Sequence, residues 1–480
     1  IWPITVATTI LKPGGYNRLH QMVEKVEKLP YRAFSGTDSA AISDLSAASH
    51  TDLHHLKPIK PLPARKSEDK VPLIDCFTAP CKGGCPIHQD IPEYIELVRR
   101  GLYGPALKLI TEKNPLPFLT GTICAHRCQN KCTRNFYDES IHIRDAKLVA
   151  AAHGYDALMA SIRPTEKLPG KKAAIIGGGP TGIAAAYFLA RGGVQTTIFE
   201  REEKLGGVPR YVIPAFRISD EALDKDVALM ERLGVEVKCG ASAPSVAELK
   251  KMGYTHILLA TGAWQAGELG IPGNVRGVIA WMKEMKQQVK PCLEGHVVVV
   301  GAGNTAMDAA RVAKRMGAAS STIVYRRTKK EMPADEHELK LAIDEGVNLV
   351  ELAAPVEQKD GRLICNQMKL GEPDASGRRS PVATGETFEI PCDLVLSAIG
   401  EKVDAKLMAE NGIEMGRKGP AFQTNVENVW SAGDAHRGPA TVVEGIADAA
   451  AFAEAVIGAA HTYEIPEQAY PTKADAIAKK

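Results

Sequence analysis

Six of the ten cysteines gather in one stretch of the chain, and their spacing points to metal chemistry. They form two runs, Cys76-x4-Cys81-x3-Cys85-Pro86 and Cys124-x3-Cys128-x3-Cys132. Thiolates at such spacings, with a proline after the last cysteine of a run, are typical ligands of iron–sulfur clusters. Zinc and disulfides are the alternatives, but no Cys-x-x-Cys pair occurs, and the reducing compartment expected for this chain disfavours disulfides. The other cysteines are expected to be small buried apolar side chains: Cys239, Cys292, Cys365 and Cys392.

The number of clustered thiols predicts two clusters. Six thiolates exceed the roughly four ligands of one [4Fe-4S] cube and fall about two short of a pair. On a single helix, Cys124, Cys128 and Cys132 would share one face, because they are four residues apart. One face cannot surround a cube, so irregular turns are predicted in this stretch.

The loop Gly177–Gly182 reads G-x-G-x-x-G and lies between a predicted buried strand, Lys172–Ile176, and a predicted helix. Gly177 would allow the tight turn, Gly179 the close approach of a pyrophosphate, and Gly182 the packing of helix on strand. A fortuitous glycine-rich turn is the alternative, but the flanking elements favour a dinucleotide site.

Residues after this loop make FAD the expected dinucleotide. Glu200 ends the next predicted strand, Gln195–Glu200, where a carboxylate can accept hydrogen bonds from a ribose. Arg201 follows it directly, and Leu205-Gly206-Gly207 comes soon after.

Two later motifs agree with FAD. The segment Ser431-Ala432-Gly433-Asp434 is typical of the strand that closes the FAD site in flavoproteins with two dinucleotides, where the carboxylate binds the ribityl chain. A helix predicted from Thr441 to Ile457 can direct its first N–H groups at the flavin pyrimidine. Thr261 lies in an Ala-Thr-Gly turn of the same class.

A second loop, Gly301–Ala306, follows the predicted strand His296–Val300, and its third small position is alanine. Asn304 and Thr305 open its predicted helix. The next predicted strand ends in Tyr325-Arg326-Arg327 instead of an acid. Arginine can bind a 2′-phosphate that a carboxylate would repel, so NADPH is favoured over NADH. Solvated surface charges are the alternative reading of the two arginines.

The composition sets limits on the class of protein. With 59 Lys plus Arg against 57 Asp plus Glu, the formal charge of +2 gives no general attraction to nucleic acid. No uninterrupted apolar run reaches the roughly 18–20 residues that span a bilayer. The glycine content and the strand–loop–helix patterns predict an α/β fold with two Rossmann-like nucleotide-binding domains, the NADPH domain inserted in the FAD domain, after a small helical iron–sulfur domain. A cytoplasmic location is expected.

The order of these motifs resembles the flavoprotein family of the glutamate synthase small subunit and the N-terminal half of dihydropyrimidine dehydrogenase. The segment Asp75 to Gln89, with Ile91-Pro-Glu-Tyr94, is most similar to large bacterial members named as selenate reductase iron–sulfur/FAD subunits. The resemblance covers about Leu73 to Gly458. In addition, Pro3 to Tyr16 is similar to the end of a dihydroorotate-dehydrogenase-like barrel that precedes this module in those chains.

The resemblance implies roles for individual residues. The implied FAD contacts are Gly177, Gly179, Gly182, Glu200, Gly207, Arg217, Thr261, Asp434 and Thr441, and the implied NADPH contacts are Asn304, Thr305, Arg326 and Ile399-Gly400. Arg201, Arg327 and Gly433 complete the predicted cofactor-binding residues. One [4Fe-4S] cluster would use Cys76, Cys81 and Cys132, and the other Cys85, Cys124 and Cys128.

The chain departs from the family pattern at two cluster positions. Leu73 stands where the family often has a cysteine, and Lys147 stands where it has a glutamate or glutamine ligand. The missing ligands could come from water or from side chains near the cysteine runs, which are Asp75, His126, His142 and Asp145.

The expected domain order combines these patterns. Residues 1–34 would be the end of a β/α barrel, and residues 35–70 would be a linker without periodic elements. The iron–sulfur domain would cover 71–165, the first FAD part 166–276, the NAD(P)H domain 277–400, the second FAD part 401–465 and a tail 466–480. Helices are predicted at 91–100, 103–112 and 140–162 within the iron–sulfur domain.

The predicted activity is hydride transfer from NADPH to flavin, followed by single-electron transfer through the clusters to an acceptor. The hydride step needs no side-chain acid or base, so no catalytic residue is predicted. The acceptor could be a barrel domain of a longer chain, a ferredoxin-like protein or a molybdoenzyme subunit, and the terminal substrate stays open. The alternatives are a self-contained disulfide or quinone reductase and a non-catalytic structural subunit.

Overall fold

The computed structural model describes residues 19, 20, 22–24, 27, 38–48, 79–136, 138–373, 379–414 and 422–458. These belong to two units, Ile1–Arg65 with Thr133–Ser140, and Lys66–Cys132 with Ile141–Lys480. Cys76, the implied barrel segment Pro3–Tyr16 and the tail 466–480 lie outside the described residues.

The first unit contains a helix where none was predicted. Residues Ser39–Ala48 form α3, inside the stretch expected to be a linker without elements. Asp38 explains its start, because the carboxylate accepts a hydrogen bond from Ala41 N at 3.0 Å, as helix-capping residues do. None of its residues is buried, so α3 depends on local propensity and capping more than on packing.

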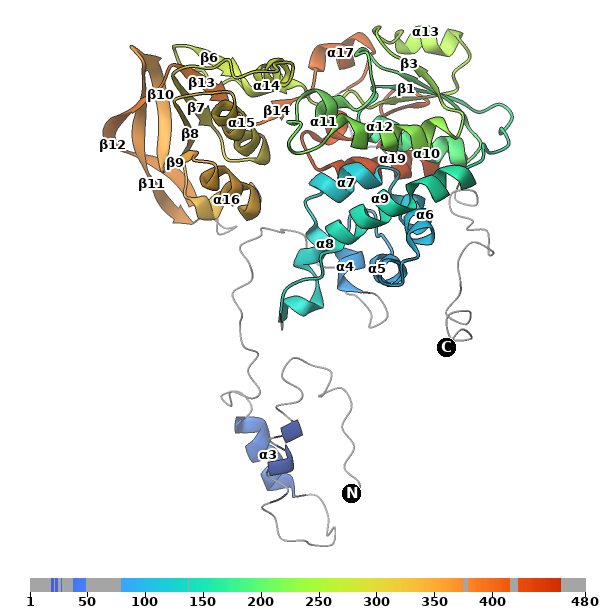
Figure 1. The fold of residues 1–480 in the computed structure, drawn as a ribbon, viewed down its shortest axis with the longest axis horizontal. Helices are drawn as coiled ribbons and strands as arrows, with labels where there is room; N and C mark the ends of the chain where they lie inside the picture. The colour runs from blue at the N-terminus through green and yellow to red at the C-terminus, as the bar shows by residue number, and fades with distance from the viewer. Residues whose placement is uncertain are drawn as a thin grey trace. The chain divides into compact units, whose positions relative to one another are not determined.

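In the second unit, the cysteine-rich part forms a helical domain (Figure 1). Its helices are α4 (Pro80–Gly84), α5 (Ile91–Arg99), α6 (Tyr103–Lys113), α7 (Pro117–Ile123), α8 (Arg127–Asn130) and α9 (Ile143–Ser161). The predictions for α5, α6 and α9 agree with these bounds within three residues. The predicted irregular turns are also present, because Cys124 follows α7 with extended backbone and His126 has φ 39° before the four-residue α8.

The first parallel sheet follows the helical domain. Its strand order is β15-β4-β1-β2-β3, and neighbouring strands are parallel. The strands are β1 (Lys172–Ile176), β2 (Gln195–Phe199), β3 (Glu236–Lys238), β4 (His256–Leu259) and β15 (Val429–Ser431). The associated helices are α10 (Pro180–Arg191), α11 (Gly207–Tyr211), α12 (Asp220–Glu231), α13 (Val246–Lys251), α17 (Ala405–Glu410), α18 (Asp434–Arg437) and α19 (Val442–Ile457).

A second parallel sheet has the order β6-β13-β7-β8-β9. Its strands are β6 (Val275–Gly277), β7 (His296–Val300), β8 (Ser320–Tyr325), β9 (Asn348–Glu351) and β13 (Leu394–Ser397), with α14 (Val278–Lys286), α15 (Asn304–Arg315) and α16 (Glu336–Asp344). Strand β15 returns to the first sheet only after this domain, so the second Rossmann-like domain is inserted in the first, as predicted. The crossing point carries a short antiparallel pair, β5 (Gln265–Ala266) with β14 (Glu401–Lys402).

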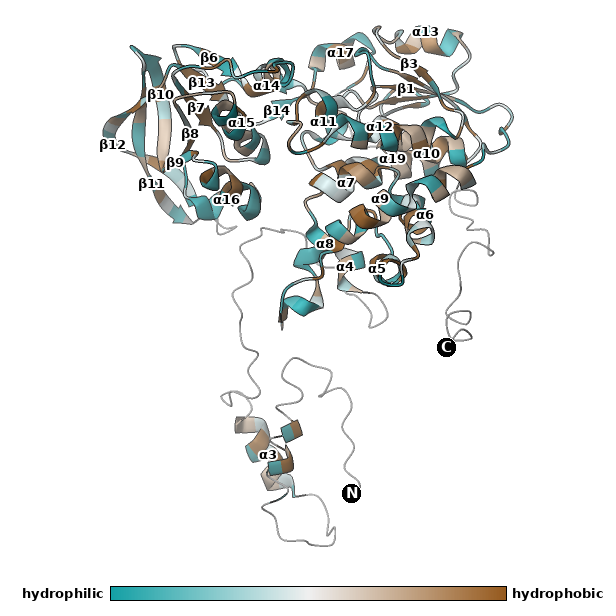
Figure 2. Ribbon diagram, viewed as in Figure 1, coloured by the Kyte–Doolittle hydropathy of each residue, from teal (hydrophilic) through white to brown (hydrophobic). Residues whose placement is uncertain are grey.

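The inserted domain also carries an antiparallel sheet that was not predicted. It consists of β10 (Ala353–Lys359), β11 (Arg362–Pro373) and β12 (Arg379–Pro391) in sequence order. Figure 2 shows that α10 and β7 are largely hydrophobic, and most of their residues are buried, so the sequence marks them clearly. Strand β12 is mostly exposed and mixes polar and apolar residues, so it gives a weak pattern.

One apolar core joins the helical domain to the first sheet. It includes Tyr94 and Leu107 from the helical domain, and Ile175, Leu189 and Phe452 from the first Rossmann-like domain. Asp226 on α12 strengthens the join, because its buried carboxylate accepts hydrogen bonds from the backbone N–H groups of Phe118 (3.0 Å) and Leu119 (2.8 Å) at the start of α7. This contact fixes the helix that ends directly before Cys124.

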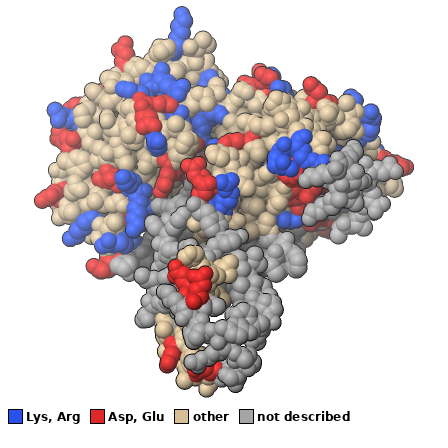
Figure 3. Space-filling model, turned by 60° about the horizontal axis from the view of Figure 1, so that its bottom comes forward, with Lys and Arg blue, Asp and Glu red and all other residues tan. Residues whose placement is uncertain are grey.

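Charges of both signs are interspersed over the described residues on the face shown in Figure 3. Among the described residues, no helix is both long enough and apolar enough to cross a bilayer. The expectation that the chain does not bind nucleic acid stays a prediction.

Candidate functional site

The first glycine loop has the tight geometry that its sequence requires. Gly177 has φ 106°, and a Cβ there would lie 2.4 Å from the backbone oxygen of Ala260. A Cβ on Gly182 would lie 2.0 Å from the oxygen of Gly177. Both positions therefore exclude any side chain, because real Cβ atoms do not approach backbone atoms so closely.

Glu200 also shapes the loop from the end of β2. Its carboxylate accepts hydrogen bonds from Gly178 N at 2.6 Å and from Glu202 N at 2.9 Å, and the residue is buried. The acid predicted to meet a ribose thus first holds the glycine loop against the strand. The following Arg201 stacks over the ring of Trp264 at 5.1 Å.

The closing segment brings Asp434 to the same place. Gly433 has φ 65°, and its N–H donates to Asp448 Oδ2 at 2.9 Å. Asp434 Oδ1 accepts a hydrogen bond from Ala440 N at 3.0 Å. Burial raises the pKa of Asp434 to about 6. Asp448 was missed by the sequence analysis, since an acid on the apolar helix α19 gave no signal before the fold brought it to Gly433.

Thr441 caps α19, and the partner of Thr441 in this cap connects the helix to the cysteine domain. Its hydroxyl and backbone form a capping box with Glu444, which explains why the helix begins at Val442. Glu444 Oε1 also pairs with Arg127 Nη1 of α8 at 3.1 Å. Neither Arg127 nor Glu444 was predicted to matter.

The second glycine loop repeats the geometry of the first. Gly301 has φ 146°, and a Cβ there would lie 2.2 Å from the oxygen of Ala398. Asn304 Oδ1 accepts a hydrogen bond from Asp335 N at 3.1 Å. Thr305 hydrogen-bonds the side chain of Glu401, which sequence reasoning missed; burial raises the pKa of this carboxyl group.

The two arginines that follow β8 differ in environment. Arg326 is exposed, whereas Arg327 is half-buried and its Nε has no hydrogen-bond partner among the described residues. Gly400, with φ 115°, accepts a hydrogen bond from Gly267 N at 2.7 Å where the chain leaves the inserted domain.

A large cleft of about 2590 Å³ joins the two loops. Most of the predicted cofactor-binding residues line it: Gly177, Gly179, Glu200, Arg201, Gly207, Arg217, Thr261, Asn304, Thr305, Asp434 and Thr441. Gly182, Gly400, Gly433, Arg326 and Arg327 are not part of its wall. Thr261 Oγ1 is buried without a hydrogen-bond partner among the described residues, which suits a bound polar ligand. The cleft therefore presents polar groups and glycine turns that suit dinucleotides.

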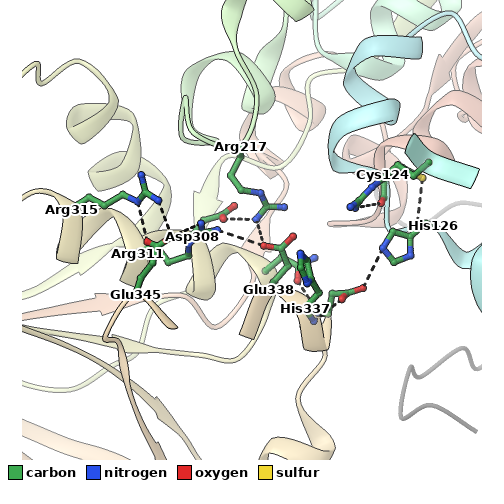
Figure 4. Close-up of polar contacts among 12 residues, drawn as sticks. Cys124, His126, Arg217, Asp308, Arg311, Arg315, His337, Glu338 and Glu345 are labelled. Carbon is green, nitrogen blue, oxygen red and sulfur yellow. Dashed lines mark hydrogen bonds and ion pairs between the residues drawn. The ribbon is translucent and has the colours of Figure 1, made fainter. Parts of the chain in front are cut away.

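Arg217 lines the cleft and also joins the two Rossmann-like domains (Figure 4). Its Nη1 lies 2.5 Å from Asp308 Oδ1 on α15. It also lies 2.7 Å from Glu338 Oε2 on α16, in ion-pair contact without the alignment of a hydrogen bond. Burial raises the pKa of Asp308 to about 6, and Arg217 opposes this rise. Arg217, implied to contact FAD, is thus engaged by the inserted domain.

A smaller cavity of about 500 Å³ lies in the helical domain and is lined by Cys85, Cys124 and Cys128. Burial raises the pKa of the Cys128 thiol to about 12 and also raises that of Cys85. Cys81 and Cys132 do not line this cavity, but their charges interact with each other. The implied division of the cysteines into two sets stays a prediction.

The donor set of the cavity suits a cluster better than one ion. Within residues 79–136 and 138–373 and the other described parts, no three His, Cys, Asp or Glu side chains meet closely enough to hold a single metal ion. Three thiols that line one cavity without meeting at a point match a polynuclear group with separated metal corners.

The cleft and the cysteine cavity share a wall. Four residues line both of them: Cys124, Ala125, Thr441 and Val443. Cys124 is thus a cavity thiol that also borders the nucleotide cleft. Of the four scattered cysteines, none lines the cleft, so a redox cysteine pair beside the flavin is absent from its described wall.

Family models match three parts of the chain. Residues 171–449 match the pyridine nucleotide-disulphide oxidoreductase family. The chain belongs to this family. Residues 68–155 match the domain described as dihydropyrimidine dehydrogenase domain II, 4Fe-4S cluster, and residues 1–57 match the N-terminal TIM-barrel domain of oxidoreductase YgfK. The chain therefore combines a pyridine nucleotide oxidoreductase domain with a 4Fe-4S domain.

Curated relatives match most of the chain. The chain is 39% identical over 469 residues to oxidoreductase YgfK of Escherichia coli K12, covering 95% of this chain and 45% of the relative. It is 35% identical to the NADPH-Fe(3+) oxidoreductase subunit beta of Geobacter sulfurreducens, covering 80% and 64%. It is 31% identical to the glutamate synthase [NADPH] small chain of Halomonas elongata, covering 84% and 92%. The chain thus spans about half the length of its YgfK relative.

Solved structures agree on the fold. Mycobacterium tuberculosis FprA in complex with NADPH matches 66% of this chain and 89% of its own, with a TM-score of 0.53 and 19% identity. The predicted pair of Rossmann-like domains is confirmed. The membership of the glutamate synthase small-subunit family is also confirmed, whereas the selenate specificity implied by the resemblance stays a prediction.

Proposed function

We propose that this chain takes hydride from NADPH in the cleft and passes electrons singly through cysteine-bound clusters to an acceptor domain or subunit. The observation that carries the proposal is the wall shared by the cleft and the cysteine cavity, in which Cys124 borders both. A bound FAD would convert two-electron hydride chemistry to single-electron steps.

The residues of the cleft support this order of events. In the first half, Gly177 and Gly179 leave room for a pyrophosphate, and Thr261 and Asp434 present polar atoms to a flavin. In the second half, Asn304 and Thr305 open α15, where the helix N-terminus favours phosphate. Arg326 and Arg327 would bind the 2′-phosphate that distinguishes NADPH from NADH.

The cysteines support two clusters. Cys85, Cys124 and Cys128 would hold the one beside the cleft, and Cys81 and Cys132, with Cys76, the other. Burial raises the pKa of the Cys85 and Cys128 thiols, so assembly of a cluster must displace their protons. About eight irons per chain are expected after anaerobic reconstitution.

The acceptor is proposed by analogy. The relatives in Geobacter sulfurreducens and Halomonas elongata are named as a subunit and a small chain, which favours a partner for this chain too. The match of residues 1–57 to a TIM-barrel domain favours a barrel as one such partner. A ferredoxin-like protein or a molybdoenzyme subunit is a further candidate, and the substrate, selenate included, depends on the partner.

The test is an anaerobic NADPH titration followed by visible absorption. Bleaching of the flavin together with reduction of iron–sulfur absorption is expected. The Cys85→Ser variant should keep flavin bleaching but lose electron transfer to an added one-electron acceptor. The control is Cys365→Ser, a buried cysteine of the inserted domain that lines neither space. A wild-type chain whose flavin bleaches without any iron would instead support a self-contained reductase.

A further inference from the structure

Lys147 lines the cysteine cavity together with Cys85, Cys124 and Cys128. It lies on α9 and is only 5% exposed. Lysine is almost never buried without a partner, because removing an ammonium from water is costly. A buried lysine in a thiol-lined cavity therefore requires a negative charge nearby to balance its ammonium group.

The other basic side chains of the cavity have partners. Arg127 pairs with Glu444, and Arg144 Nη1 donates to the backbone oxygen of Cys124 at 3.3 Å. Among the described residues, Lys147 makes no hydrogen bond or ion pair, although its charge interacts with the Cys85 and Cys128 thiols and with the buried carboxyl group of Asp226. The ammonium is therefore positioned to balance an anionic occupant of the cavity.

The described wall of the cavity contains no Asp, no Glu and no cysteine beyond the three. His126 and Gln89 also line it, but each is engaged elsewhere. His126 Nε2 lies 4.0 Å from Asp335 Oδ2, and Gln89 Nε2 donates to the backbone oxygen of Ile110 at 3.1 Å. Tyr94 lines the cavity too, but a phenol is not among the usual ligands of an iron–sulfur cluster. A protonated lysine has no lone pair to give to iron.

We propose that Lys147 faces the fourth iron of the cluster held by Cys85, Cys124 and Cys128 as a charge partner and not as a ligand, so that this iron is released before the others. This inference rests on the proposed function, because it requires a cluster at these cysteines. On oxidation, one electron passes to ferricyanide and one Fe²⁺ leaves, which converts a [4Fe-4S]²⁺ cluster to [3Fe-4S]⁺. The three thiolates keep the remaining irons.

The experiment compares four full-length chains after anaerobic reconstitution: wild type, Lys147→Glu, Lys147→Arg and Val149→Glu. Glutamate is nearly as long as lysine and supplies an oxygen ligand, whereas arginine keeps the charge and supplies none. Val149 lies on the same helix but is 38% exposed, so Val149→Glu controls for an added acid. Flavin absorption reports folding in each chain. The series is repeated with Cys81→Ser, which removes a ligand of the other cluster.

After mild ferricyanide oxidation, electron paramagnetic resonance measures the three-iron clusters. Wild type, Lys147→Arg and Val149→Glu should each show the signal of about one such cluster from this site, and Lys147→Glu at least about fivefold less. Added Fe²⁺ and dithionite should restore the four-iron form. Iron–sulfur absorption without a three-iron signal in wild type, or equal signals in Lys147→Glu and Val149→Glu, would overturn the inference alone. Absence of iron–sulfur absorption from every chain would overturn the proposed function as well.

Discussion

The two glycine loops have the same backbone shape but differ in the third small residue of the motif. Gly177 and Gly301 both have positive φ, and each leaves no room for a Cβ beside a neighbouring strand end. The third position is Gly182 in the first loop, pressed against a backbone oxygen, and a fully buried Ala306 in the second. The turn is thus sterically fixed in both loops, whereas the third small position of the second loop has room for one methyl group.

The helices after the loops differ in charge. The fifth residue of α10 is the buried Ala184, whereas the fifth residue of α15 is the buried Asp308. Asp308 holds Arg217 of the other domain, so the second helix docks the two domains while the first fills an apolar core.

The strands that follow the helices differ at their ends. Glu200 is buried and bonded to its own loop, whereas Arg326 is exposed and open to a ligand. Packing thus sets the shared turn in both loops, whereas the polar residues around the turn differ between them.

The largest expected effect comes from Gly182→Ala. Its Cβ would lie 2.0 Å from a backbone oxygen that cannot move away without breaking the turn. We expect a loss of about 4 kcal/mol or more in the free energy of unfolding, together with loss of bound flavin. Ala306→Gly in the second loop should cost only about 0.5–1 kcal/mol. Denaturant unfolding measures the stability of each variant, and flavin absorption measures its bound flavin. Similar losses of stability in the two variants would contradict the difference in packing between the two loops.

The double variant Arg326→Ala/Arg327→Ala tests nucleotide selection. If the arginines bind a 2′-phosphate, NADPH binding should weaken by about 2–4 kcal/mol, because charge-assisted hydrogen bonds are lost. NADH binding should change little. Stopped-flow flavin reduction with each nucleotide measures the difference. Equal losses for both nucleotides, or a wild-type preference for NADH, would contradict the assignment.

Asp434→Ala tests the closing segment of the first half. The carboxylate lines the cleft and is not replaced by a neighbouring acid of the same segment. We expect FAD retention to weaken by about 1.5–3 kcal/mol while the iron content stays unchanged. Flavin remaining after dialysis gives the measurement, and full occupancy in the variant would remove Asp434 from the site.

The smallest effect concerns pH and the docking acid of the second half. Burial raises the pKa of Asp308 from 3.8 to about 6, so the folded chain binds this proton more tightly than the unfolded chain. Its contribution to stability is full below pH 4 and is lost as the pH rises to about 6. In Asp308→Asn, the free energy of unfolding should decrease by about 1–2 kcal/mol less over this pH range than in the wild type. Denaturant unfolding at several pH values measures it, and identical slopes would show that Asp308 titrates normally.

Much of the fold could be predicted because the strong elements are locally encoded. The strands Lys172–Ile176 and His296–Val300 were predicted with their observed bounds, since a buried parallel strand is a continuous apolar run before a glycine. The α3 helix and the β10–β12 sheet were missed. The residues of α3 and β12 are largely exposed, so no apolar period marks these two elements.

In the candidate site too, locally encoded residues were predicted and residues that depend on distant contacts were missed. Residues fixed by a motif, such as Gly177 and Asp434, were found because their chemistry depends on neighbours in sequence. Asp448, Glu401 and Asp226 were missed because each acts on a backbone or side chain far away in sequence.

The amino-acid sequence specifies the two glycine loops, the six clustered thiols and the order of the segments that carry them, because short-range spacing encodes turns and ligand sets. Folding in three dimensions places Cys124 between the cleft and the cysteine cavity, pairs Arg217 with Asp308 of the inserted domain and buries Lys147 beside three thiols. Such contacts join residues brought together by helix packing, and no local pattern records them.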